Sequence, residues 1–150
     1  MFGKRESLCL GLVCITFIGC AGEPALKVPD LAPVTGTVTM DGSPLAGAVL
    51  SFLPKGNTSG QVAMATTDAS GHYALSYSNG MEGCPSGEYQ VFISKLVTPD
   101  GNPIPEGQTA ADVGAVDMIP ARYRNMESPA GAIMIPEGGK SGVDFQLKSK

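Results

Sequence analysis

The sequence contains no tryptophan, a single histidine and few charged residues, which make up 16% of its 150 positions. Its net charge is −4, and its largest basic cluster is the pair Arg122 and Arg124. Nucleic-acid binding requires a stripe of Lys and Arg that displaces counterions from phosphates. The scarcity of basic residues therefore excludes nucleic acid as a partner.

The residues that most enzymes need are also missing. A Ser-His-Asp arrangement could use only His72, and the alternation of its segment puts this side chain on the solvent face. Catalytic or structural zinc needs about three or four His, Cys or carboxylate ligands. We therefore expect no catalytic residue, no metal site and no cofactor, and we predict that the chain is not an enzyme.

Cysteine is scarce as well, with four residues, of which Cys9 and Cys14 lie in the apolar N-terminal run. If this run is removed and Cys20 is modified, Cys84 is left alone and no internal disulfide can form. Cys84 is then either a small residue of no consequence or a free thiol that cross-links two copies.

What the chain does have at its start is typical of an export signal. Lys4 and Arg5 precede an uncharged, mostly apolar run over residues 8–18, which is too short to span a bilayer as a helix. Residues 17–21, FIGCA, resemble a bacterial lipobox, although Phe17 stands where Leu is usual. The resemblance implies a signal peptide over residues 1–20, lipid on Cys20 and placement in the outer membrane where the cell has one. The alternative is ordinary cleavage after Ala21 or Gly22, which would release the protein from the membrane.

Residues 21–33, AGEPALKVPDLAP, follow the lipobox without any periodicity. The three prolines in this stretch favour an extended chain that rises about 3.1 Å per residue. We interpret residues 21–33 as a tether between the lipid and a domain over residues 34–150, and a disordered N-terminus would serve the same purpose.

Glycine and proline are abundant, at 20 and 12 residues, and apolar residues alternate with polar ones in short runs between them. In residues 34–40, for example, Val34, Gly36, Val38 and Met40 share one face. A period of two in β-branched residues predicts strands with one buried face. Seven short strands favour two antiparallel sheets packed face to face; we expect them in residues 34–40, 48–53, 62–68, 72–78, 87–97, 131–135 and 143–148.

These same runs resemble a known family. The segments VTGTVTMDGSPLAGAVLSFLP, TTDASGHYALS, GEYQVFISK and VDFQL together resemble the transthyretin-like (prealbumin-like), or carboxypeptidase-regulatory-like, domain. The resemblance covers residues 34–147 and implies a seven-stranded Greek-key β-sandwich in a small bacterial lipoprotein. It implies no activity, because related hydroxyisourate hydrolases depend on histidines and on a C-terminal Tyr-Arg-Gly-Ser that this chain lacks.

A long insertion separates the fifth and sixth predicted strands. It covers residues 98–130, and a connection of this length is usually functional or disordered. Thr109 and Asp112 resemble a capping box, which predicts either a long loop or a short helix through Met118. Arg122, Tyr123 and Arg124 combine an aromatic ring with two guanidinium groups, as contact sites often do. The alternative is that Tyr123 closes the edge of the sandwich while both arginines are solvated.

Together these observations predict an exported, lipid-anchored protein of the cell envelope with a structural or protein-interaction role. Its expected partners are the membrane, through the lipid, and envelope proteins or polysaccharide. The alternative function is a carbohydrate- or peptide-binding module that uses residues 98–130. Sugar sites usually present exposed aromatic rings, and only Tyr123 and Phe92 are candidates for this.

Overall fold

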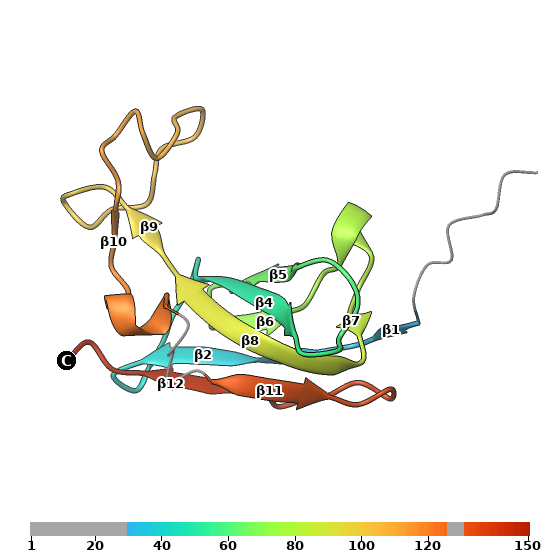
Figure 1. The fold of residues 1–150 in the computed structure, drawn as a ribbon. Coiled ribbons are helices and arrows are strands. Elements are labelled where there is room, and N and C mark those ends of the chain that lie inside the picture. Colours follow the sequence, from blue (N-terminus) through green and yellow to red (C-terminus); the bar gives the residue numbers. More distant parts are fainter. Residues whose placement is uncertain (1–29, 126–130) are drawn as a thin grey trace, which may run out of the picture.

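A computed structural model describes residues 30–125 and 131–150, so the predicted signal peptide, Cys20 and most of the tether lie outside the described residues. The described part is all-β and contains no α-helix (Figure 1). Its helical elements are two single 3₁₀ turns, η1 (Ser78–Gly80) and η2 (Ala121–Tyr123). Its strands are β1 (Leu31–Ala32), β2 (Thr35–Met40), β3 (Ser43–Pro44), β4 (Val49–Lys55), β5 (Ala63–Thr66), β6 (His72–Ala74), β7 (Cys84–Pro85), β8 (Gly87–Ser94), β9 (Leu96–Val97), β10 (Val116–Asp117), β11 (Ala132–Ile135) and β12 (Phe145–Leu147).

Two groups of strands build the body of the molecule. One is a four-stranded antiparallel sheet in the order β11-β8-β4-β5. In the other, β2 pairs with β12 along one edge and with β3 and β6 along the other. A bridge between Met64 and Ser76 connects β5 to the residues after β6, which joins the two groups on one side. Each of the seven segments predicted as strands overlaps at least one observed strand, and residues 87–97 contain two, β8 and β9.

The predicted alternation is confirmed in the core. Val38 of β2, Leu50 and Phe52 of β4, and Tyr89 of β8 are fully buried. The two sheets meet through an aromatic cluster, in which the Phe52 ring lies 6.3–6.4 Å from the rings of Tyr73, Tyr89 and Phe145. Since these rings come from strands of both groups, the two sheets pack face to face through the cluster in a sandwich-like arrangement.

One feature of the sheets corrects the prediction of purely antiparallel pairing. β12 runs parallel to β2, with Phe145 opposite Val38 and Leu147 opposite Met40. The cause is the segment over residues 136–142, which carries the chain from β11 in one sheet to β12 in the other and so does not form a hairpin. Parallel strands require such a crossover, and alternation within a strand carries no information about its direction.

The domain also begins earlier than expected. Leu31 and Ala32, which we assigned to the tether, form β1 and pair with Pro85 and Cys84 of β7. Ala32 is 1% exposed and belongs to the core cluster. The segment that we interpret as a tether therefore cannot extend beyond residue 30. The sequence carries no sign of β1, because a two-residue strand is too short to produce a visible period.

Residues 96–119, which we call the excursion, leave the body of the molecule. β9 and β10 pair at its base, and the chain between them projects beyond the sheets (Figure 1). The short helix predicted from Thr109 is absent: residues 110–114 form turns. Thr109 and Asp112 do exchange the bonds of a capping box, with the Thr109 hydroxyl 2.7 Å from Asp112 Oδ2, yet Gly114 at φ +60° ends the turn before a helix develops.

Candidate functional site

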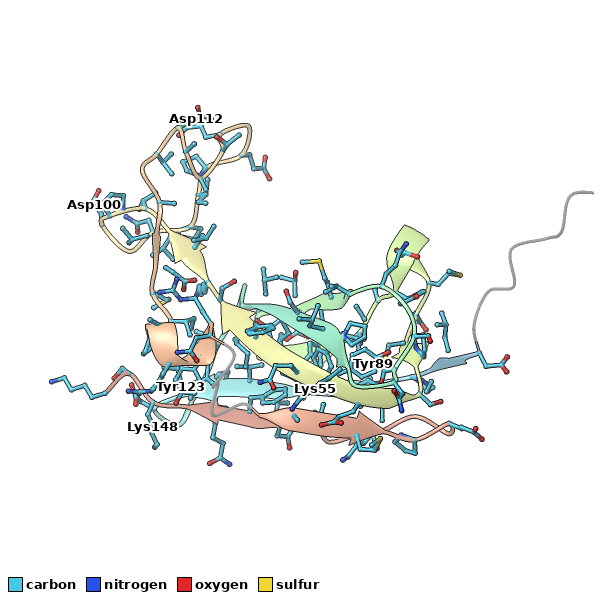
Figure 2. The ribbon with its side chains drawn as sticks, viewed as in Figure 1. Lys55, Tyr89, Asp100, Asp112, Tyr123 and Lys148 are labelled. Carbon is cyan, nitrogen blue, oxygen red and sulfur yellow. The ribbon has the colours of Figure 1, made fainter. Side chains whose placement is uncertain are left out.

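The predicted contact residues 122–124 lie where the excursion returns to the body, and Figure 2 labels Tyr123 there. Tyr123 is 6% exposed and belongs to the core cluster, and its Oη accepts a hydrogen bond of 3.0 Å from the Lys148 amide. A side chain this buried cannot supply a contact surface. Of the two interpretations, the structure supports the one in which Tyr123 closes the edge of the sandwich.

The two arginines bind partners within their own chain. The Arg122 guanidinium lies 5.1 Å from the centroid of the Tyr123 ring and donates a hydrogen bond to the Lys148 carbonyl. Arg124 Nε lies 3.4 Å from Asp117 Oδ2. Together with Tyr123 they form what we call the clamp, residues 122–124, which fixes the base of the excursion to the C-terminal segment.

Asp117 of β10 extends the clamp into the ribbon. Its Oδ1 accepts hydrogen bonds from the Lys95 amide at 3.0 Å and from the Ile119 amide at 2.8 Å, while Oδ2 faces Arg124. One carboxylate therefore joins β10, the residue before β9 and the clamp. This arrangement holds the ribbon in a defined orientation, so the excursion projects from a rigid base.

The outer part of the excursion is exposed and acidic. None of residues 98–115 is buried, and Asp100 and Asp112 lie at its outer end (Figure 2). The Thr109 hydroxyl and amide both donate to Asp112, which lowers the pKa of that carboxyl. At neutral pH the end of the excursion therefore carries negative charge.

Sequence reasoning missed the apolar side chains at the base of the excursion. Leu96, Val116 and Met118 are 49%, 49% and 43% exposed, whereas their neighbours Val97 and Ile119 are 3% and 1% exposed. The signal was present, since residues 116–119, VDMI, alternate with a period of two over a stretch for which we expected a long loop or a short helix.

A hollow lies over β2 and β6, apart from the excursion. It has a volume of about 730 Å³, and its polar lining residues are Thr35, Thr37, Thr66, Asp68, His72 and Asp144. Asp144 Oδ1 accepts from the Thr37 amide at 2.8 Å and from its hydroxyl at 2.7 Å, which lowers the pKa of Asp144. His72 is exposed, as predicted, and in the described part of the chain its imidazole takes no part in a hydrogen bond.

Cys84, the predicted free thiol, is a core residue. It lies in β7 with no exposed surface, and burial raises the pKa of its thiol. Since the thiolate is the reactive form, a buried thiol with a raised pKa is protected from reagents and from a second copy. The structure favours the inert interpretation of Cys84 over the cross-linking one.

Three kinds of feature are absent from the described residues. No group of three or more His, Cys, Asp or Glu side chains comes together to hold a metal ion in residues 30–125 and 131–150. The same ranges contain no helix with the length and apolar character needed to cross a membrane. Every Phe and Tyr ring in these ranges is buried apart from Phe92, which is half-buried, so none of these rings lies fully exposed for stacking on a sugar.

Comparison with known proteins adds little to this geometry. No family model and no curated protein matches the sequence. The chain is similar to a DUF3823 family protein from Parabacteroides merdae, at 12% identity, over 81% of this chain and 46% of that one, with a TM-score of 0.35. It is also similar to a 9R-lipoxygenase from Cyanothece, at 14% identity, over 84% of this chain and 17% of that one, with a TM-score of 0.33. The chain thus spans less than half the length of either structure, and neither likeness assigns it an activity.

Proposed function

We propose that this chain is an exported, lipid-anchored protein of the cell envelope that presents the excursion to a protein partner. Its body is proposed to be a Greek-key sandwich of the transthyretin-like kind, and its role is structural or interactive and not catalytic. The lipid sits on Cys20, residues 21–29 form the spacer, and the outer membrane is the expected location.

The observation that carries the proposal is the position of the two ends of the body. β1, where the described chain begins, lies at one end, and the excursion projects from the other (Figure 1). A body tethered through its N-terminus would therefore hold the excursion away from the lipid. Residues 21–29, at about 3.1 Å per residue, would add roughly 30 Å of extended spacer.

The clamp supports the same proposal. A surface that is presented to a partner gains affinity when its geometry is fixed before binding. Here Tyr123, Arg124 and Asp117 fix the base of the excursion to the body. This is the arrangement expected of an element that is held out for recognition.

Between the two alternative ligands, a polypeptide is better supported than a carbohydrate. Sugar sites rely on exposed aromatic rings. Among the Phe and Tyr rings in the described part of the chain, only that of Phe92 is not fully buried, and it is half-buried. The base of the excursion instead exposes the aliphatic side chains of Leu96, Val116 and Met118, which suit contact with a protein.

The anchor is tested by labelling cells with a palmitate analogue and comparing Cys20→Ser with Cys84→Ser. We expect the label and membrane association to disappear in Cys20→Ser and to persist in Cys84→Ser, because Cys84 is buried in the core. Labelled Cys20→Ser protein, or a mature chain that begins at Gly22 or later by mass spectrometry, would disprove the anchor.

A further inference from the structure

The base of the excursion exposes aliphatic side chains on a projecting ribbon. Val116 lies in β10, and Met118 follows that strand, where its amide still donates a hydrogen bond of 2.9 Å to the Lys95 carbonyl. Because they are two positions apart on an extended chain, Val116 and Met118 share a face, while Leu96, opposite Asp117, lies on the other. All three are more than 40% exposed, although the adjacent Val97 and Ile119 are buried. The exposed pair Val116 and Met118 on one face therefore marks a candidate interaction surface.

The shape of this surface limits the kind of partner. Small molecules bind in concave pockets that enclose most of their surface. The β9–β10 ribbon projects from the body, and none of residues 98–115 is buried (Figure 1). A projecting ribbon can bury its aliphatic side chains only against a macromolecule that covers it.

The charge of the excursion limits the partner further. Residues 96–121 contain no Lys, Arg or His, and they contain Asp100, Glu106, Asp112 and Asp117. Arg124 neutralises Asp117, so three exposed carboxylates remain toward the outer end. This field repels an anionic membrane or a nucleic acid and attracts a basic partner.

We infer that the excursion binds a basic polypeptide segment in which apolar residues are interspersed with Lys or Arg. Apolar residues of the segment cover Val116 and Met118, and its cations pair with Asp100 and Glu106. This inference rests on the proposed function, since it names the chemical class of the protein partner. A second copy of this chain is a poor match, because the chain carries a net charge of −4.

The test measures binding of the full-length chain, in uncharged detergent, to a short synthetic peptide of alternating Lys and Leu. Two control peptides replace Lys with Glu or Leu with Ser. We expect the Lys-Leu peptide to bind at least about tenfold more tightly than either control, because it alone supplies both charge and apolar contact. Raising the salt concentration should weaken its binding.

Paired variants locate the site. Asp100→Asn with Glu106→Gln should weaken peptide binding about tenfold, whereas the same change of charge at Asp30 and Glu137, away from the excursion, should leave it unchanged. Met118→Gln should weaken binding severalfold, and Met134→Gln, an exposed methionine on β11, should not.

Equal effects of the two charge pairs, or of the two methionine variants, would overturn the inference, because binding would then be a property of the whole acidic surface. Self-association of the chain that Met118→Gln abolishes and the Lys-Leu peptide leaves intact would overturn it in favour of a second copy. The two tests can be told apart, because a wild-type chain that takes up no palmitate label would disprove the proposed location without affecting peptide binding in detergent.

Discussion

The body of the molecule and the excursion are stabilised in opposite ways. In the body, Phe52 contacts rings from both sheets, and residues far apart in sequence share one core. In the excursion, residues 98–115 contain no buried side chain, and their hydrogen bonds are short-range, as between Thr109 and Asp112 or between Thr98 and Asn102. The body thus provides the stability, and the excursion depends on its base for orientation.

This difference explains how one small domain combines a rigid frame with a surface free to vary. Burial of apolar surface fixes the body and makes its core residues sensitive to substitution. The excursion contributes few buried side chains beyond Val97, Ile119 and the clamp, so substitutions at its outer end should leave the free energy of unfolding unchanged. Four predictions test this division of roles, in order of expected effect.

The largest effect is expected at the boundary between the two regions. Tyr123→Ala removes a buried ring and should lower the free energy of unfolding by about 4 kcal/mol. Tyr123→Phe keeps the ring and loses the hydrogen bond from the Lys148 amide, so it should cost about 1 kcal/mol. Urea denaturation measures both. An unchanged unfolding midpoint in Tyr123→Ala, together with loss of peptide binding, would mean that Tyr123 belongs to the contact surface after all.

The next effect concerns the closest approach of backbone within the body. A Cβ added to Gly36 of β2 would lie 1.9 Å from the Val143 carbonyl oxygen. Gly36→Ala must therefore separate β2 from the chain before β12, at a cost of about 3 kcal/mol. Gly138→Ala is the matched control, because nothing lies within 4 Å of its Cβ position. Equal unfolding midpoints for the two variants would disprove the close approach.

A smaller effect is expected at Thr67, a buried polar residue that connects two turns of the body. Its hydroxyl accepts from the Ala48 amide at 2.8 Å and donates to the Leu45 carbonyl at 2.5 Å. Thr67→Val keeps the shape and leaves the Ala48 amide without its partner, which should cost about 2 kcal/mol. Its exposed neighbour serves as the control: Thr66→Val should be neutral in thermal denaturation, and a similar loss there would point to an effect of strand propensity.

Much of the body could be predicted from the sequence, because burial of one face forces a period of two. This logic placed Tyr73, Leu75 and Tyr77 inward and His72 outward, as the structure has them. It could not give the direction of β12, since pairing depends on where the crossover returns and not on side-chain alternation. It also missed β1, whose two residues are too few to show any period.

The candidate site was less predictable. The composition of residues 122–124 suggested contact, yet whether Tyr123 faces solvent depends on the C-terminal segment, which is distant in sequence and covers it. The capping-box pattern at Thr109 formed its hydrogen bonds without a helix, because no apolar face was present to be buried and to stabilise one. Local signals can predict local bonds but not the tertiary contacts that decide exposure.

The smallest predicted effect compares the same pair of residue types in the two regions. In the body Asp144 accepts two hydrogen bonds from Thr37, 107 positions away, and in the excursion Asp112 accepts two from Thr109, three positions away. Both sets of bonds lower the pKa of the carboxyl in the folded protein. A lowered pKa contributes stability above the unfolded value of about 3.9, and that stability is lost as the pH falls through the folded value.

Only Asp144 should couple this titration to unfolding of the whole domain, since the bonds of Asp112 are local and do not depend on the body. Asp144→Asn should lower the Tm by about 2 °C at neutral pH and flatten the decline of Tm as the pH falls below about 4. Asp112→Asn should reproduce the wild-type curve over the whole range. Matching acid curves for wild type and Asp144→Asn would show that the Thr37–Asp144 bonds contribute nothing to holding β2 against β12. A shift in Asp112→Asn would show that the excursion is part of the same cooperative unit as the body.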